Sequence, residues 1–429
     1  MNLHAAFSPQ INQIRTLSRP AKLFLLTILC DGLFFSGWNL FFNLYILAAG
    51  YSREFLGMVN AAPSVAALLF SVPMGLLSDR MGRKRAMLLG FTLGTITPLM
   101  LALVHQPALM LVMAFLWGIA GQLYLLSQAP FMMKVSDDTN RVLLFSLSFG
   151  MFPLASALGN ALAGQLPGIF SRLFGLESGS SAAYQAVLVT SLISSLAALI
   201  PLGFIHEPRA EFHTETSLDP AKPKRSVWSI LIRPLTLKLS LPNLMLGFGA
   251  AMLIPYMNVF FAERHHLNDQ ALGWLFSLSS LLIGVASFIA PRLVGNLGGK
   301  VRMVVVGQSV SLAFLLMLGF SPLAWLAVIG FLVRGTLMNM VAPLFDAFTM
   351  EQTPAAEQGT VNSMRGLAWN VGWAIGPYVS GVVQARHGFA PLFIATAILY
   401  GLANMLTWIF FRTISREPKQ PAVIAQEDL

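Results

Sequence analysis

Charged residues are scarce in this sequence. Only 10% of its 429 residues are Asp, Glu, Lys or Arg, whereas a soluble domain usually carries about 25%. Apolar residues make up 56% of the chain. A folded chain in water could not hide so much apolar surface, because even a large soluble protein leaves much of its chain exposed. The composition therefore excludes an ordinary soluble domain and favours a protein embedded in lipid.

Cysteine is almost absent as well. The single Cys30 lies in an apolar run, which excludes a disulfide framework and a cysteine metal cluster. We interpret it as a small buried hydrophobe. His265 and His266 beside Glu263 have no further ligands at metal-binding spacing, so we expect no metal and no cofactor. The first twenty residues contain no apolar stretch, so we expect no cleaved signal peptide.

Signatures of other protein classes are missing. The net charge of +9 comes from basic residues in short segments between apolar runs, not from one basic face, so no nucleic-acid partner is expected. Gly298-Gly299-Lys300 lacks the spaced glycine of a P-loop and is followed by Val301, which argues against an ATP-driven pump. The remaining alternative is a membrane enzyme or a non-transporting receptor. The sequence shows no intramembrane His/Asp or Ser/His cluster that would support it.

Long apolar runs, by contrast, are abundant. A helix needs about 20 mostly apolar residues to cross a bilayer, and the sequence offers twelve such runs. They predict an all-α, multi-pass membrane protein with spans at 23–48, 55–77, 85–104, 107–133, 141–166, 184–205, 235–261, 269–292, 302–320, 322–350, 359–385 and 391–412.

The charges in the loops test this count. With twelve spans, 21 of the 27 Lys and Arg residues fall on the side of the termini, 4 on the opposite side, and 2 inside spans. Basic residues concentrate in cytoplasmic loops. The pattern therefore predicts that both termini are cytoplasmic. We expect the protein to lie in the cell inner membrane.

The chain divides into two similar halves. A polar, proline-containing interval predicts a first six-span bundle at 1–205, a cytoplasmic linker at 206–234, a second bundle at 235–413 and a cytoplasmic tail at 414–429. A shift of 216 residues carries Phe115 onto Phe331 and Gly150 onto Gly366. Two parallel repeats of this kind are related by a pseudo-twofold axis along the membrane normal, with the substrate site between them near mid-bilayer.

One loop is distinctive. Between the second and third spans stands Gly75-Leu76-Leu77-Ser78-Asp79-Arg80-Met81-Gly82-Arg83-Lys84-Arg85. This segment, the signature loop, resembles the signature of the major facilitator superfamily, both in its spacing and in its place after span two. The resemblance implies two pseudo-symmetric six-helix bundles and transport by alternating access.

The resemblance also implies a cytoplasmic latch. Its predicted members are Gly75, Asp79, Arg80, Gly82, Arg83 and Lys84. The two glycines permit close approach and a tight turn, and Asp79 can accept hydrogen bonds at a neighbouring helix N-terminus, where the helix dipole favours an anion. We expect Asp79 to face span eleven near Gly359–Asn362.

Ionisable residues inside spans are costly and therefore informative. Asp31 in span one is predicted to bind a proton or another coupling cation, the alternative being a structural acid hydrogen-bonded to a neighbouring helix. Arg334 lies near the middle of span ten. Drug exporters of the superfamily often carry an arginine in span four, where this chain has Gly118, and the repeat places Arg334 at the equivalent point of the second half. A role for Arg334 in substrate binding or coupling and a role as a structural tie stay open.

Further polar residues complete the prediction. Asp346 and Arg365 are expected to pair and to gate the cytoplasmic end. The residues predicted to contact substrate in a central cavity are Asn39, Asn43, Gln122, Tyr124, Gln128, Tyr256, Asn258, Arg334, Asn339, Trp369 and Asn370. Glu351 and Glu357 are expected to be solvated loop acids.

The predicted function is secondary active transport, with no enzymatic activity. Proton-coupled export of a small amphipathic molecule is the first hypothesis, and proton-coupled uptake of a polar metabolite or organic anion anchored by Arg334 is the alternative. The expected partners are the small-molecule substrate, protons or another coupling ion, and the lipid bilayer. We expect a monomer.

Overall fold

The computed structural model describes residues 17–137, 140–206, 232–293, 299–354 and 357–413. Throughout these ranges the ordered elements are helices, and they contain no strand. Most of the predicted linker at 206–234, the predicted tail at 414–429 and Gly298 lie outside the described residues.

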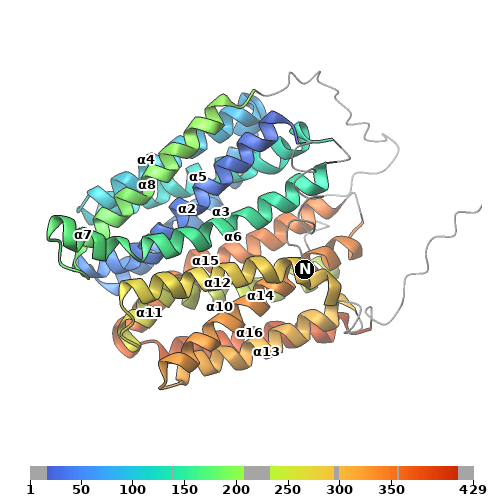
Figure 1. Cartoon of the computed structure of the whole chain (residues 1–429). Coiled ribbons are helices and arrows are strands. Elements are labelled where there is room, and N and C mark those ends of the chain that lie inside the picture. The colour runs from blue at the N-terminus through green and yellow to red at the C-terminus, as the bar shows by residue number, and fades with distance from the viewer. Residues whose placement is uncertain (1–16, 138–139, 207–231, 294–298, 355–356, 414–429) are drawn as a thin grey trace, which may run out of the picture.

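The first half is a bundle of long helices, drawn in blue to green in Figure 1. Ser18, Ser52 and Ser180 each cap a helix by accepting a hydrogen bond from the backbone N–H three residues on. The helices are α2 (Arg19–Ala48), α3 (Arg53–Met81), α4 (Arg83–Leu103), α5 (Pro107–Val135), α6 (Arg141–Ala163), the short α7 (Leu166–Phe174) and α8 (Ser181–Phe204).

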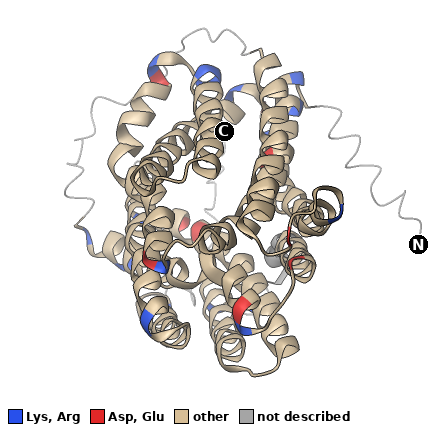
Figure 2. Cartoon of the chain, turned by 90° about the vertical axis from the view of Figure 1, so that its left-hand side faces the viewer, with Lys and Arg blue, Asp and Glu red and all other residues tan. Residues whose placement is uncertain are grey.

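The second half lies alongside the first and is drawn in yellow to red (Figure 1). Its elements are α10 (Pro234–Leu253), the 3-10 turn η1 (Ile254–Tyr256), α11 (Met257–Arg264), α12 (Asp269–Leu293), α13 (Lys300–Phe320), α14 (Ala324–Gln352), α15 (Gln358–His387) and α16 (Ala390–Phe411). Viewed along the helices, charged residues are sparse among the others (Figure 2).

Eleven spans in the described residues are long and apolar enough to cross a membrane, counting α6 with α7, and α10 with η1 and α11, as single spans. The remaining predicted span, the eleventh in chain order, is α15. It is not among them, although its 30 residues would reach about 45 Å. Its Asn, Gln, Arg and Trp side chains make it less apolar. It packs against α3 and α10, where polar side chains need not meet lipid. The predicted all-α, twelve-span architecture is confirmed.

Span seven corrects the sequence prediction. A continuous helix was expected over 235–261, but the structure divides this segment into α10, η1 and α11. Pro255 lies in the 3-10 turn. Proline lacks a backbone N–H, and its ring clashes with the preceding helical turn. The break therefore falls at Pro255.

The structure strengthens the repeat inferred from sequence. Adding 216 to the first residues of α2, α3, α4, α5 and α6 gives 235, 269, 299, 323 and 357, each within one residue of the start of α10, α12, α13, α14 and α15. The turns match too: Gly50 has φ +87°, and His266, its equivalent, has φ +53°. The caps before α3 and α12, Ser52 and Asn268, are also equivalent.

The buried core shows how the halves meet. The end of the molecule that carries Arg53 is called the Arg53 end, and the end that carries Arg83 is called the Arg83 end. The largest cluster of buried apolar residues crosses both halves and includes Tyr45, Phe260 and Phe261. Two further clusters belong to one half each, around Phe131 and around Phe348. The halves thus share a core toward the Arg53 end and have separate cores toward the Arg83 end.

Candidate functional site

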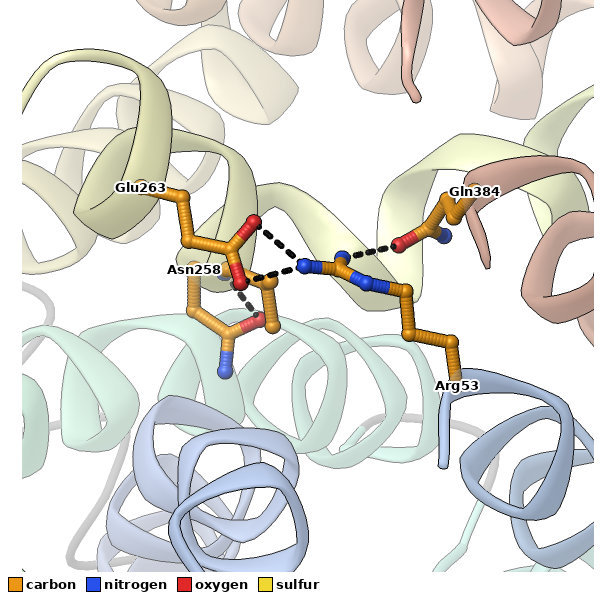
Figure 3. A network of polar contacts seen from close by, with 5 residues as sticks. Arg53, Asn258, Glu263 and Gln384 are labelled. Atoms are coloured by element: carbon orange, nitrogen blue, oxygen red, sulfur yellow. Dashed lines mark hydrogen bonds and ion pairs between the residues drawn. The ribbon is translucent and has the colours of Figure 1, made fainter. Parts of the chain in front are cut away.

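An ion pair joins the halves at the Arg53 end. Nη2 of Arg53 in α3 donates to both carboxylate oxygens of Glu263 in α11, at 2.7 and 2.8 Å, and Nη1 donates to Gln384 in α15 at 3.2 Å (Figure 3). Nε2 of Gln384 donates in turn to Ser380 at 2.8 Å. One side chain of the first half is thus tied to two helices of the second.

A cluster of side-chain amides lies deeper between the halves. Nδ2 of Asn60 donates to Asn43 at 3.1 Å, and Nδ2 of Asn43 donates to the backbone carbonyl of Pro255. Nδ2 of Asn258 donates to the carbonyl of Leu40 at 2.8 Å. The turn at Pro255 exposes its backbone carbonyl to α2. The break in span seven therefore allows Asn43 to donate its hydrogen bond to Pro255.

Glycines allow the backbones of the two halves to touch. A Cβ atom on Gly164, the residue that follows α6, would lie 2.6 Å from the Cα of Gly273 in α12. A Cβ atom on Gly57 in α3 would lie 2.6 Å from the carbonyl oxygen of Pro377 in α15. Such distances leave no room for a side chain. The pairs α6–α12 and α3–α15 are therefore held closely where these glycines lie.

Two further hydrogen bonds cross between the halves. The hydroxyl of Tyr184 in α8 donates to Asp269 at 2.9 Å, and Nδ2 of Asn160 in α6 donates to Ser280 in α12 at 3.3 Å. Like the contacts above, both come from the parts of the helices toward the Arg53 end. This end of the interface is closed.

The Arg83 end differs. Asp79 is exposed and pairs with Arg83 within the signature loop. No described atom lies within 4 Å of the position of a Cβ on Gly359 or Gly366 in α15. The predicted contact of Asp79 with span eleven is not formed in this conformation. Whether it forms when this end closes stays a prediction.

The signature loop is instead tied to its own half. Nη1 of Arg83 donates to the hydroxyl of Ser78 at 2.9 Å, and that hydroxyl lies 2.6 Å from the hydroxyl of Ser127 in α5. Gly82, between α3 and α4, has φ +89°, a conformation that favours glycine. Arg80 and Asp79 face outward.

Ion pairs also connect side chains at the Arg83 end of the second half. Nη2 of Arg365 lies 2.7 Å from the carboxylate of Asp346, as predicted for the pair, although a gating role stays a prediction. Lys300 pairs with Glu351. The expectation of a solvated Glu357 is wrong, because this residue is 8% exposed and pairs with Arg233 at 2.5 Å.

Asp31 occupies a different environment from these paired acids. It is partly buried in α2 and makes no hydrogen bond or ion pair with any described residue. Phe35 and Asn39, one and two turns further along the same helix, are exposed. The buried hydroxyl of Tyr124 interacts electrostatically with Asp31 and has no hydrogen-bond partner among the described residues.

The other predicted cavity residues fall into two groups. Some are exposed or partly exposed in this conformation, namely Asn39, Gln122, Gln128, Asn339, Trp369 and Asn370. Others are buried, namely Asn43, Tyr124, Tyr256, Asn258 and Arg334. Within the second group, Asn43 and Asn258 join the halves, and Tyr256 donates to the carbonyl of Pro377 at 2.8 Å. A substrate-contact role for either group stays a prediction.

Sequence reasoning missed the residues that close the Arg53 end. Arg53 was counted only as a loop charge, and Gln384, Asn60 and Ser280 were not singled out. The partners of Arg53, Gln384 and Ser280 across the interface lie about 120 to 330 positions away, so no local pattern marks these three residues. The repeat offers one signal, since Arg53 and Asp269 occupy equivalent first positions of α3 and α12 and both bind across the interface.

His265 lies outside the spans, in the turn after α11. Its ring packs against Phe260 and Phe261. Burial, together with the nearby Arg264 and His266, lowers the pKa of His265 below its ordinary value. The imidazole therefore stays neutral at neutral pH, which suits packing rather than a charged role.

Comparison with known proteins agrees with this architecture. The model of the Major Facilitator Superfamily matches residues 24–263 and 239–428. The multi-drug resistance efflux pump PmrA of Streptococcus pneumoniae serotype 4 is 24% identical over 368 residues, 84% of this chain and 87% of that protein. The multidrug resistance protein MdtG of Dickeya zeae is 26% identical over 385 residues, 87% of this chain and 89% of that protein.

Solved structures show the same fold. A bacterial homologue of the human lysosomal transporter Spinster, in an inward-facing and occupied conformation, has a TM-score of 0.73 at 13% identity and covers 93% of this chain and 98% of its own. The nucleoside transporter NupG has a TM-score of 0.67 at 16% identity, covering 93% and 99%. At these identities the likeness concerns the fold alone.

Proposed function

The chain belongs to the Major Facilitator Superfamily, and we propose that it is a proton-coupled exporter of small amphipathic molecules that works by alternating access. The halves are joined at the Arg53 end, while the signature loop stands undocked at the Arg83 end. Basic residues concentrate at the Arg83 end, which the positive-inside rule assigns to the cytoplasm. On this proposal the structure is the inward-open state of the carrier.

Export is favoured by the relatives. PmrA and MdtG are named as multidrug efflux and multidrug resistance proteins, and each matches this chain over most of its length. The 21 Met and 32 Phe residues would suit an adaptable apolar binding surface.

The observation that carries the coupling proposal is the lone carboxylate of Asp31. A carboxylate without a partner inside a membrane is costly, and it escapes that cost by binding a proton. Within the part of the chain that the structure describes, the titratable groups near it are Tyr124 and Cys30, and neither carries a positive charge. Proton binding at Asp31 would therefore remove an uncompensated charge and make it easier for the halves to close around it.

Proteoliposomes test this function. The purified protein would be reconstituted with a pH-sensitive dye inside, and three amphipathic fluorophores would be offered: a cation, a neutral compound and a carboxylate. We expect at least one to move against an imposed proton gradient. Protons and substrate moving in opposite directions support export, whereas movement in the same direction supports the alternative, uptake. If no fluorophore moves, the export proposal fails.

The coupling role has its own variants. Asp31→Asn should abolish substrate-linked proton movement while the protein still binds substrate. Glu177→Gln, an exposed acid in the loop between α7 and α8 of the same half, makes the same chemical change and should behave as wild type. Intact proton movement in Asp31→Asn would rule out Asp31 as the coupling residue.

A further inference from the structure

The repeat reveals an unequal distribution of charge between the halves. The shift of 216 carries Asp31 in α2 onto Gly247 in α10, and Gly118 in α5 onto Arg334 in α14. Each half therefore has one ionisable residue and one glycine at the same two positions. The first half holds the acid without the arginine, and the second holds the arginine without the acid.

Packing explains both glycines. A Cβ on Gly118 would lie 2.5 Å from the Cα of Pro63 in α3. A Cβ on Gly247 would lie 3.0 Å from both the Cα and the carbonyl oxygen of Trp369 in α15. A side chain at position 118 would clash with the backbone of Pro63, and one at position 247 would fit only if the backbone of Trp369 moved by a few tenths of an ångström. The second half therefore has no acid at the position equivalent to Asp31.

Arg334 is nearly enclosed and has no counter-ion. Its residue is 6% exposed. Nη2 donates to the hydroxyl of Tyr400 in α16 at 2.7 Å, and the guanidinium lies 5.6 Å from the centre of that ring. Nε is buried without an acceptor, and no acid pairs with Arg334 among the described residues. The described side chains around Arg334 thus leave the Nε–H donor of its guanidinium without an acceptor.

The two lone charges are not equivalent chemically. A carboxylate can bind a proton and become neutral, but a guanidinium keeps its charge in a protein. Burying a lone charge costs several kcal/mol. The hydroxyl and ring of Tyr400 offset part of that cost at Arg334, and a bound anion can offset the rest. The fork geometry matches planar, two-oxygen anions such as a carboxylate.

We propose that Arg334 and Tyr400 form the binding site for the anionic group, a carboxylate or phosphate, of an amphipathic molecule that this protein transports. The inference rests on the proposed transport function and adds a substrate class to it. Because the hydroxyl of Tyr400 accepts a hydrogen bond from Arg334, its own proton is free to be donated to the same anion.

Beyond Arg334, toward the Arg83 end, α14 carries exposed polar residues. Asn339 and Asp346 lie five and twelve positions after Arg334 and are both exposed. The amide of Asn339 donates to the carbonyl of Gly335 at 2.9 Å, so its side chain is held along the helix. Gly335 itself, beside Arg334, has only the Ser279 hydroxyl near its Cβ position, at 3.8 Å.

Thermal shift in detergent tests the site without knowledge of the natural substrate. The probes are octanoate, octyl phosphate, methyl octanoate as the neutral analogue, and inorganic phosphate and acetate as free anions. We expect octanoate or octyl phosphate to raise the melting temperature of the wild type and methyl octanoate to have no such effect. Arg334→Gln should weaken the apparent affinity about tenfold or more, the loss expected for a charge-assisted hydrogen bond.

Further variants keep the test decisive. Arg334→Lys keeps the charge but loses the fork, and should bind the amphipathic anions more weakly than wild type, which a purely structural arginine would not predict. Arg302→Gln removes an exposed arginine from α13 and should leave anion binding unchanged. Protection by acetate and inorganic phosphate equal to that by octanoate and octyl phosphate would show a site for free anions and overturn the substrate assignment.

Failure of the inference is distinguishable from failure of the proposed function. If no anion protects the wild type, or if protection persists in both Arg334→Gln and Arg334→Lys, the site is refuted. Proton-coupled movement of a cationic or neutral fluorophore in proteoliposomes would still support transport. If no fluorophore moves while Arg334-dependent anion binding is intact, the transport proposal fails and the anion site stands.

Discussion

Arg53 in α3 and Glu263 in α11 form an ion pair of 2.7 Å that joins the two halves of the molecule at one end. Their side chains are 27% and 43% exposed, so water and salt weaken the attraction. A pair of this kind can hold a closed end without locking it permanently.

The first prediction concerns this pair. Glu263→Gln should weaken the closed Arg53 end by about 0.2 to 1 kcal/mol, the range for exposed ion pairs, and so raise the population open at that end about 1.4- to 5-fold. Spin-label distances across that end would measure the shift in a Cys30→Ser background. The charge reversal Arg53→Glu with Glu263→Arg should restore the wild-type distribution. An unchanged distribution in Glu263→Gln would show that the pair does not control closure.

The second prediction concerns the undocked signature loop. In a Cys30→Ser background, Asp79→Cys with Gly359→Cys should crosslink slowly, because the loop is undocked in this state and a disulfide needs Cα atoms within about 7 Å. Adding Glu263→Gln should speed the crosslink, since weakening one end favours closure of the other. A crosslinking rate that does not respond to Glu263→Gln would argue against coupled ends.

The third prediction concerns the contact of α6 with α12. Gly164→Leu should destabilise the closed interface by about 1 to 3 kcal/mol, the usual cost of overpacking, because Gly273 leaves no space for a side chain. Thermal unfolding in detergent would measure the loss. Gly168→Leu is the matched control, because a Cβ on this exposed glycine of α7 meets nothing within 4 Å. Equal effects of the two substitutions would contradict the close-packing interpretation.

The fourth prediction concerns Asp346 and Arg365. The side chain of Asp346 is 65% exposed whereas that of Arg365 is 6% exposed. Asp346→Asn leaves the buried guanidinium of Arg365 without its carboxylate and should cost about 1 to 3 kcal/mol in stability. Arg365→Gln leaves a solvated carboxylate and removes the contact of the guanidinium with the Phe345 ring, and should cost about 1 kcal/mol. If the pair gates transport, a double-mutant cycle on transport rate should show coupling between the two residues. Additive effects of the two substitutions on the transport rate would show that the pair has a structural role and does not gate transport.

The fifth prediction concerns pH. Because the pKa of His265 is lowered by burial and by Arg264 and His266, the unfolded chain binds this proton more readily than the folded one. The stability that the neutral His265 contributes is thus fully present above the ordinary histidine pKa, about 6.5. It is lost as the pH falls below that value and through the lower pKa of the folded state. His265→Gln should flatten the fall in melting temperature between about pH 7 and pH 5. His387→Gln, at the exposed last residue of α15, serves as the control. Equal pH profiles for His265→Gln and wild type would refute the assignment.

The sequence by itself determined the spans, the repeat and the family. These features are local or periodic: lipid requires long apolar helices, and the repeat is carried by helix starts a fixed 216 residues apart. It also marked Asp31 and Arg334, because a charge in an apolar run is visible without any partner. The Asp346–Arg365 pair was predictable because its members lie only 19 residues apart.

Only the tertiary structure decided which polar residues hold the halves together. Asn43 and Asn258 were predicted to face a cavity, yet they are 4% and 1% exposed in an interface between helices more than 200 residues apart. Their burial depends on the break at Pro255 and on which end of the carrier is closed. A carrier that alternates between two packings presents the same residue to a cavity in one state and to an interface in the other, so its sequence specifies both states and the fold adopted here selects one.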